Sequence, residues 1–378
     1  MIVHFTTVHP RVDSRIRYKE LASLQSAFGE PLAMYVQDGL GDEVDRLTDL
    51  RIVDTGPPLS RYLRMTIGAW RMINALIVAR PKIAHFHDPE LLPWAILLRL
   101  WGIKVVYDVH EDVPRQVLHN PGLPGWLRPL LPGLVSMIEW VGGQLLSGVV
   151  AATPEIAARF PARKTVLVQN YPLVGELDVP NQIPMSARPR EFVYVGGLTK
   201  HRGLFTMIEA TARVSGAGAR LRIAGRFNTP EDQARAEQST GWASVRFDGW
   251  AARSQVSALL TRARAGLVTL FPIRNYVEAR PVKLFEYMSA GLPVIASDFP
   301  RWSEIVRGAS CGLLVDPEDP ASIAKAMQWV LDHPDEAQEM GQRGRQAVLD
   351  LYNWGREAEK LVTFYDALLG LSAKMAQS

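Results

Sequence analysis

Residues 276–298 read YVEARPVKLFEYMSAGLPVIASD and predict a helix followed directly by a strand. Pro281 suits the first turn of that helix, and Gly291 suits the position just past its last turn. The apolar residues 293–297 then predict a buried strand. A helix that leads straight into a buried strand is the repeating unit of a parallel α/β sheet.

The same segment carries the side chains of an anion site. Lys283 and the free backbone N–H groups lie together at the helix N-terminus, which favours an anion such as a diphosphate. Glu286 lies about one turn further on, where its carboxylate can accept hydrogen bonds from two sugar hydroxyls. Glu278 precedes it, with seven residues between the two acids. The segment predicts a sugar-nucleotide site, although any helix can carry a Lys and a Glu on its exposed face.

Both halves of the chain alternate short apolar runs with helical stretches, which predicts parallel sheets covered by helices. At 378 residues the chain suits two domains of about 150–200 residues each. The predicted strands are 2–8, 32–36, 83–86, 105–109, 149–152 and 166–168 in the first half, and 192–195, 221–224, 245–247, 266–270, 294–296 and 312–315 in the second. We therefore expect two doubly wound parallel-sheet domains facing across a cleft, with ligands at the carboxyl ends of the strands.

Composition limits the class of protein. Hydrophobic residues at 47% and charged residues at 21% are typical of a soluble globular protein. The net charge of +3 is too small to argue for nucleic-acid binding. The single cysteine, Cys311, excludes an intrachain disulfide and fits a reducing cytosol. We expect no signal peptide, and no stretch reaches the roughly 18 uncharged apolar residues that a spanning helix needs.

Polar residues follow the first predicted strand. Residues 9–16 have the pattern H-P-x-x-D-x-R-I and lead into a helix. Asp13 or Ser14 can cap that helix. Arg15 is a candidate ligand for a phosphate or an acceptor group.

Histidines end the next strands. Alternation places His85 and His87 on one face of their strand, which suggests a metal. The sequence offers no clear carboxylate partner for the pair, so we expect no metal ligand here. His85 fits a hydrogen-bonded core histidine, whereas His87 and Asp88 are candidates for the cleft. The acids that follow the next strand, in the run 107–112 (YDVHED), are costly unless they are paired or face a cleft.

The loop 195–203, VGGLTKHRG, links the first strand of the second half to a helix. Paired glycines let the backbone approach a ligand closely, and Lys200 and Arg202 supply positive charge. Arg226 and Trp250 follow the next two strands and border the expected base and phosphate sites.

The spacing of Glu278 and Glu286 resembles the E-x7-E motif of retaining glycosyltransferases of the two-domain GT-B fold, in particular glycosyltransferase family 4. Residues 9–16 resemble family 4 enzymes that build bacterial surface polysaccharides. The resemblance covers almost the whole chain. The loop after residue 195 resembles the family's G-R-L…K-G loop but departs from it, because Gly197 stands where an Arg is common and Arg202 where a Lys is common.

The resemblance implies a role for each candidate residue. Glu286 would hold the nucleotide ribose, and Glu278 would lie near the donor sugar. His110 would approach that sugar and the reacting centre, oriented by Glu111 or Asp112, unless these are solvated acids at a helix start. The resulting assignments are His110 and Glu278 as catalytic, Gly197, Lys200, Arg202, Arg226, Lys283 and Glu286 as donor-binding, and Arg15, His87 and Asp88 as acceptor-side, with no metal ligand.

The resemblance implies a retaining transferase that moves a sugar from a nucleotide-diphosphate sugar to a glycan acceptor, lipid-linked in related enzymes, during polysaccharide biosynthesis. The chain has no D-x-D acid pair and no P-loop. We therefore expect a metal-independent departure of the diphosphate, stabilised by Lys283, Arg202 and helix N–H groups, and no cofactor beyond the donor. Two alternatives stay open: a sugar-nucleotide epimerase of the same fold, and a non-catalytic sugar-nucleotide-binding protein.

The resemblance also assigns roles to the domains. Residues 1–172 form the acceptor-side domain, 173–190 the Pro-rich linker and 191–353 the nucleotide-sugar-binding domain. The closing segment 354–378 would cross back onto the first domain. Residues 113–146, rich in Leu, Pro, Trp and Gly, are a candidate for docking on the cytoplasmic leaflet of the cell membrane, the alternative being a helix pair packed into its own domain.

Overall fold

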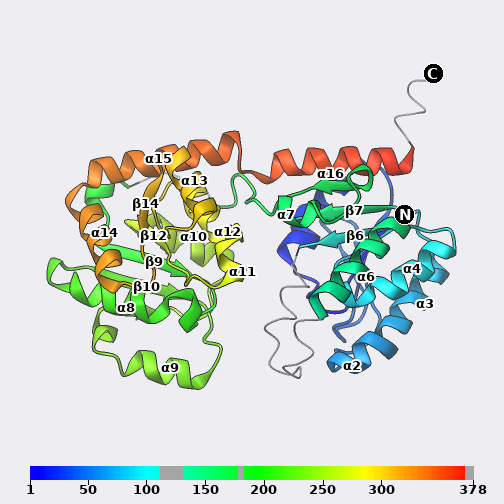
Figure 1. Cartoon of the computed structure of the whole chain (residues 1–378), viewed down its shortest axis with the longest axis horizontal. Helices are drawn as coiled ribbons and strands as arrows, with labels where there is room; N and C mark the ends of the chain where they lie inside the picture. The colour runs from blue at the N-terminus through cyan, green and yellow to red at the C-terminus, as the bar shows by residue number, and fades with distance from the viewer. Residues whose placement is uncertain (111–130, 178–182, 371–378) are drawn as a thin grey trace. The chain divides into compact units, whose positions relative to one another are not determined.

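The chain forms two compact α/β units, each with its own sheet and core (Figure 1). The computed structural model describes residues 1–110, 131–177 and 183–370. The first unit comprises residues 1–170 and 354–378, and the second comprises residues 171–353. The described residues of the predicted linker, 173–177 and 183–190, belong to the second unit.

The sheet of the first unit has the strand order β3-β4-β2-β1-β5-β6-β7-β8. Its strands are β1 (Ile2–Phe5), β2 (Leu32–Val36), β3 (Glu43–Asp45), β4 (Leu50–Asp54), β5 (Ile83–Phe86), β6 (Lys104–Val109), β7 (Gly148–Ala151) and β8 (Thr165–Leu167). β3 runs antiparallel to β4, and the other neighbours pair in parallel. Because β1 lies between β2 and β5, the strand order reverses there, and open α/β sheets bind ligands beside such a point.

The sheet of the second unit is parallel and has the order β11-β10-β9-β12-β13-β14. Its strands are β9 (Glu191–Val195), β10 (Arg220–Ala224), β11 (Val245–Phe247), β12 (Ala265–Val268), β13 (Val294–Ser297) and β14 (Gly312–Val315). Here the order reverses at β9, which lies between β10 and β12. The two sheets confirm the predicted fold class of doubly wound parallel α/β domains.

Helices cover the sheets of both units (Figure 1). In the first unit they are the π-helix η1 (Ser14–Leu21), α1 (Ala22–Ala27), α2 (Arg61–Leu63), the π-helix η2 (Arg64–Gly68), α3 (Ala69–Ala79), α4 (Leu92–Leu100), α6 (Leu131–Leu145), α7 (Pro154–Ala157) and α16 (Trp354–Leu369). In the second they are α8 (Leu204–Arg213), α9 (Pro230–Glu237), α10 (Arg253–Arg262), α11 (Arg274–Val277), α12 (Val282–Ser289), α13 (Pro300–Gly308), α14 (Pro320–Asp332) and α15 (Pro334–Asp350).

Several helix starts follow from local sequence. The Asp13 side chain accepts hydrogen bonds from the backbone N–H groups of Arg15 and Ile16, which confirms Asp13 as the cap of the first helix. Pro begins α7, α9, α13, α14 and α15, where its missing N–H costs no hydrogen bond. Pro281 does not enter the first turn as predicted but occupies the capping position before α12, whereas Gly291 takes the left-handed conformation (φ 70°) just past the helix end.

The strands of the second unit bury both faces. Along β9, Val193 and Val195 belong to one core cluster, whereas Phe192 and Tyr194 belong to another. Because successive side chains of a strand point to opposite faces, the two clusters are the two faces of the sheet. This double burial explains why the strands of this unit appear in the sequence as continuous apolar runs.

The closing helix α16 packs on the first unit. The indole N–H of Trp354 donates to the Ser23 hydroxyl at 2.9 Å, and the Glu357 carboxylate accepts the Gln169 backbone N–H at 2.9 Å. Tyr365 lies fully buried further along the helix.

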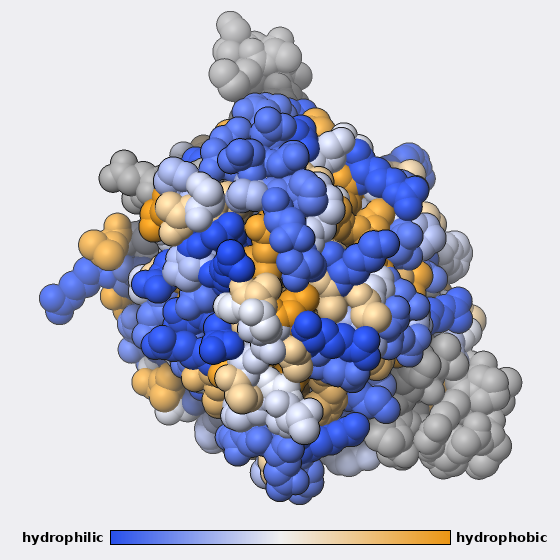
Figure 2. Space-filling view, turned by 90° about the vertical axis from the view of Figure 1, so that its left-hand side faces the viewer, coloured by the Kyte–Doolittle hydropathy of each residue, from blue (hydrophilic) through white to orange (hydrophobic). Residues whose placement is uncertain are grey.

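Among the described residues, none of the helices combines the length and the apolar character that crossing a bilayer requires. The face of the second unit in Figure 2 is mainly hydrophilic, with hydrophobic residues in small groups.

Two left-handed glycines of the second unit give a matched test of packing. A Cβ at Gly203 (φ 76°) would lie 2.1 Å from the Thr269 carbonyl oxygen, whereas at Gly218 (φ 78°) the nearest atom would be 3.7 Å away. Both alanine variants pay about 1–2 kcal/mol of left-handed strain. We expect Gly203→Ala to lose about 1–3 kcal/mol more because it also overpacks the site. Urea unfolding of both variants measures the difference, and equal midpoints would contradict it.

Candidate functional site

The glycine loop of the second unit lies against the loop that follows β10. Gly225 has φ 155°, and a Cβ there would lie 1.7 Å from the Gly196 carbonyl oxygen, so no larger residue fits. The Leu198 N–H donates to the Arg226 carbonyl at 2.9 Å and fixes the two loops together. The loops therefore present backbone at the carboxyl ends of β9 and β10, beside the point where the strand order reverses.

The predicted cations of these loops differ in exposure. Lys200 and Arg226 are exposed, and the Arg226 guanidinium carbon lies 5.9 Å from the centre of the exposed Trp250 ring. Arg202 is half-buried beside Gly197. A Cβ at Gly197 would lie 3.6 Å from the Arg202 guanidinium, an ordinary contact, so the position has room for a side chain.

Glu286 lies between two cations. Lys283 Nζ donates to its Oε2 at 2.7 Å, and an Arg253 guanidinium N–H donates to its Oε1 at 2.7 Å. Burial raises the pKa of Glu286, but Lys283 and Arg253 outweigh it, so the pKa is lowered and the carboxylate is ionised. Arg253 also pairs with Glu176 at 2.7 Å.

Arg253 was missed by the sequence analysis. It begins α10, well beyond the end of β11, so the search for polar residues directly after strands passed over it. Its partner Glu286 is distant in the sequence, and only the fold brings the two together. One signal in the sequence could have identified Arg253: it is a cation at the first position of a helix, where the helix dipole does not favour positive charge.

The two acids of the Glu278/Glu286 pair belong to different elements. Glu278 ends α11, with its carboxylate 3.9 Å from Arg274 Nε, whereas Glu286 lies inside α12. Glu286 is 5% exposed, and Glu278 is half-buried. The catalytic role of Glu278 stays a prediction.

In the first unit, Arg15 lies in the core. Its guanidinium donates to both oxygens of Asp108, at 2.8 and 2.9 Å, and its Nε lies 2.9 Å from Glu20 Oε1. All three residues are at most 4% exposed. Arg15 is therefore the counter-ion of two buried carboxylates, a different place from the exposed one that acceptor binding requires.

The two acids of this group titrate in opposite directions. Burial raises the pKa of Asp108, but Arg15, His110 and His87 outweigh burial and hold it well below its usual range. Burial and the neighbouring Asp108 raise the pKa of Glu20 well above its usual range, and Arg15 opposes them only in part. One guanidinium thus serves two carboxylates and favours the ionised form of Asp108.

Asp108 also orients two histidines. Its Oδ2 lies 3.0 Å from His87 Nδ1 and 3.2 Å from His110 Nδ1. The His110 side chain is 17% exposed, so this imidazole reaches the surface of the unit. Glu111 and Asp112, the predicted orienting residues, lie outside the described residues; among the described residues, Asp108 contacts the His110 ring.

Asp88 joins the ends of β1 and β5. Its carboxylate accepts hydrogen bonds from the Thr6 hydroxyl at 2.9 Å and from the Thr7 backbone N–H at 2.6 Å. The side chain is 2% exposed, and these bonds hold the loop after β1 in place. Within the first unit, the structure thus brings together Arg15, His87, Asp88 and His110 at the carboxyl ends of β1, β5 and β6.

Comparisons with known proteins agree with this fold. Residues 178–347 match the model of the family described as glycosyl transferases group 1. A glycogen synthase of Mycobacterium tuberculosis is 26% identical over 302 residues, which cover 76% of this chain and 69% of that protein.

Two solved structures extend the likeness to the whole chain. The sucrose-phosphate synthase of Thermosynechococcus elongatus has a TM-score of 0.76 at 20% identity, covering 98% of this chain and 99% of that one. Anabaena HepE in complex with UDP has a TM-score of 0.70 at 12% identity, covering 97% and 100%. At these identities the likeness shows the fold, which is GT-B as expected.

The buried ion pair predicts a large loss of stability on neutralisation. In Asp108→Asn the Arg15 guanidinium keeps its burial but loses its main anionic partner, so we expect a cost of about 3–5 kcal/mol. Glu209→Gln is the matched control, because Glu209 forms an exposed pair with Arg213 and should change stability little. Urea unfolding at neutral pH measures both, and a similar small effect for the two variants would refute the assigned role of the pair.

Proposed function

We propose that this chain is a retaining glycosyltransferase that moves a sugar from a nucleotide-diphosphate sugar to a glycan acceptor. Glu286 is a buried, ionised carboxylate that lies between Lys283, in the first turn of α12, and Arg253, at the start of α10. This observation carries the proposal. A fixed carboxylate suits a pair of sugar hydroxyls, and adjacent cations suit a diphosphate. The site lies in the part of the chain that matches the group 1 glycosyltransferase model.

The donor would bind across the strand ends of the second unit. Glu286 would hold the ribose, while Lys283, Arg202 and the N–H groups of the α12 first turn would hold the diphosphate. Lys200 and Arg226, exposed on the glycine loops, add positive charge at the same strand ends. These fixed positive groups would stabilise the charge of the departing diphosphate without a metal ion at that position.

Transfer with retention fits front-side attack. The acceptor oxygen would bond to the anomeric carbon on the face from which the diphosphate leaves, and the acceptor proton would pass to a diphosphate oxygen. We propose catalytic roles for His110, which is held by Asp108, and for Glu278. We assign no protein nucleophile to this step.

For the acceptor, we propose a lipid-linked glycan at the cytoplasmic leaflet of the cell membrane. Helix α6 exposes a set of large apolar side chains, each 41–55% exposed: Leu134, Met137, Ile138, Trp140, Val141 and Leu145. A water-facing helix rarely carries so continuous an apolar face, which is typical of interfacial helices. Residues 113–130 of the predicted docking segment lie outside the described residues.

The proposed donor site predicts how nucleotide sugars bind. Calorimetry of the purified chain against UDP-, GDP- and ADP-sugars should find one base that binds, with affinity unchanged by a chelator. Glu286→Ala and Lys283→Ala should each weaken binding by at least tenfold, because each removes a charge-assisted contact of about 1.5–3 kcal/mol.

Controls separate binding from transfer. Lys325→Ala removes an exposed lysine from α14 and should leave donor binding unchanged. His110→Asn should bind the donor but lose transfer to an acceptor glycan. Binding of none of the donors would favour the non-catalytic alternative, and turnover of the donor without an acceptor would favour an epimerase.

A separate prediction concerns the membrane. In flotation with vesicles that contain anionic lipid, the wild-type chain should rise with the lipid, and Trp140→Glu should remain at the bottom because a charge interrupts the apolar face of α6. Trp250→Glu makes the same change at an exposed tryptophan of the second unit and should float like the wild type. Absence of wild-type flotation would refute docking and leave the donor site untouched.

A further inference from the structure

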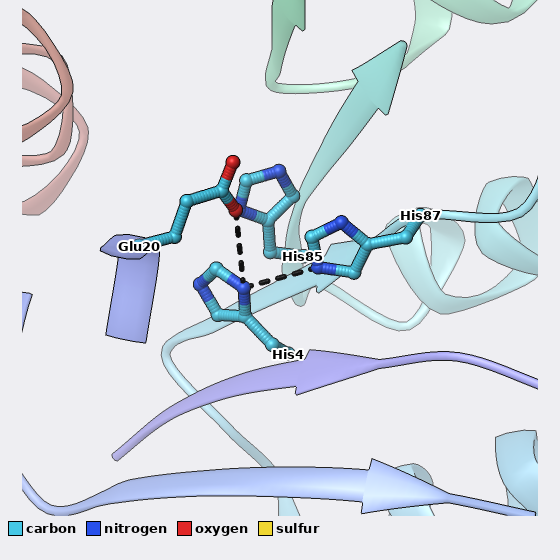
Figure 3. A group of neighbouring side chains, drawn as sticks. All are labelled: His4, Glu20, His85 and His87. Carbon is cyan, nitrogen blue, oxygen red and sulfur yellow. Dashed lines mark hydrogen bonds and ion pairs between the residues drawn. The ribbon is translucent and has the colours of Figure 1, made fainter. Parts of the chain in front are cut away.

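Four ligand-type side chains converge in the core of the first unit (Figure 3). His4 lies in β1, His85 in β5 and His87 just after β5, while Glu20 reaches in from η1. One nitrogen or oxygen of each lies within 4.8 Å of those of the others. All four residues are at most 2% exposed. The sequence analysis found no carboxylate partner for the two later histidines, and the fold supplies one in Glu20.

Each imidazole is held by its other ring nitrogen. The Tyr365 hydroxyl lies 3.2 Å from His4 Nε2 and 2.6 Å from His85 Nδ1. The Asp108 carboxylate lies 3.0 Å from His87 Nδ1. Metal-binding histidines typically donate their second N–H to such an oxygen, which fixes the ring and its tautomer.

This network leaves one electron pair unused on each of the three rings. Suppose that His4 and His85 each donate an N–H to the Tyr365 hydroxyl and that His87 donates its Nδ1–H to Asp108. His4 Nδ1, His85 Nε2 and His87 Nε2 then each carry a lone pair. His85 Nε2 is buried and has no hydrogen-bond partner, and neither does Glu20 Oε2, whereas Glu20 Oε1 forms the ion pair with Arg15.

A proton cannot satisfy the whole group. A hydrogen on His4 Nδ1 can bridge the 3.1 Å to His87 Nε2, as in an ordinary core network. It leaves His85 Nε2 and Glu20 Oε2 buried without a donor, and each such group costs about 1–3 kcal/mol. A single cation bound by the four residues would give each of them a partner.

We propose that His4, Glu20, His85 and His87 bind a divalent transition-metal ion, with Zn²⁺ as the best match. Three imidazoles and one carboxylate form a four-coordinate set that suits this ion. A tetrahedral shell with bonds of about 2.1 Å places neighbouring ligand atoms about 3.4 Å apart. The His4–His87 and His4–Glu20 contacts, at 3.1 and 3.6 Å, are already close to that spacing.

The local charge agrees with a cation. Arg15 is shared between Asp108 and Glu20, so a bound cation would supply the further positive charge that an ionised Glu20 needs. Four protein ligands fill a tetrahedral shell, so the ion has no open position for a substrate. It is a structural ion that joins β1, β5 and η1 and, through Tyr365, helix α16. It is separate from the donor site and does not rest on the proposed function.

The test uses the full chain and Zn²⁺ alone. After dialysis against a chelator and return of Zn²⁺, elemental analysis should find one equivalent bound, and Co²⁺ in its place should give the visible absorption of a four-coordinate ion. Glu20→Gln and His85→Gln should each lose that equivalent. Tyr365→Phe keeps all four ligands and should weaken Zn²⁺ about 10–100-fold. His333→Gln, in the second unit, should bind like the wild type.

The wild-type result alone can overturn the proposal, whether or not a variant folds. Less than one equivalent bound, or a Co²⁺ spectrum of a six-coordinate aqueous ion, would exclude a metal at this cluster. Equal binding by wild type, Glu20→Gln and His85→Gln, all with the wild-type far-ultraviolet spectrum, would place the ion elsewhere and overturn it too. A rise in the unfolding temperature of the metal-free wild type on adding Zn²⁺ would support it.

Discussion

The bidentate ion pair between Arg15 and Asp108 fixes the functional end of the first unit. Arg15 comes from the helix after β1, and Asp108 comes from β6, so the pair joins segments far apart in the sequence. Asp108 then uses the same carboxylate to orient His87 and His110. A buried pair of this kind contributes little net stability, but removal of either member leaves an unpaired buried charge. The position of His110, the proposed catalytic histidine, therefore depends on Asp108, a fully buried residue.

In the second unit, close packing of the backbone fixes the loops at the strand ends, as the Arg15–Asp108 ion pair fixes those of the first unit. The backbones after β9 and β10 approach so closely that Gly225 has no room for a side chain beside Gly196. This approach leaves the loop cations and the glycine backbone at the carboxyl ends of neighbouring strands. A rigid backbone surface that carries cations suits a diphosphate, because its hydrogen-bond donors need no reorganisation on binding.

The sequence predicted the features that depend on local pattern. Strands buried on both faces appear as apolar runs, and every predicted run coincides with an observed strand. The prediction extended β1 to residue 8, but it ends at Phe5, and it missed β3 and β4, at the edge of the sheet, because their residues are partly exposed and give no continuous run. Lys283 and Glu286 were predicted because one helix carries both. Glu20 was missed because η1 is a π-helix, in which residues five apart lie one turn apart, so Arg15 and Glu20 share a face that ordinary helical spacing would separate.

The contacts of Glu286 also explain how a donor could enter without leaving a charge unpaired. In the free chain both oxygens of Glu286 are held by cations, one by Lys283 and one by Arg253. A diphosphate would attract Lys283, whose flexible stem can turn from the carboxylate to a phosphate oxygen. Glu286 would keep Arg253 and gain the ribose hydroxyls on its released oxygen. Each ionised group then has a partner before and after binding, so the desolvation of this buried carboxylate is compensated in both states.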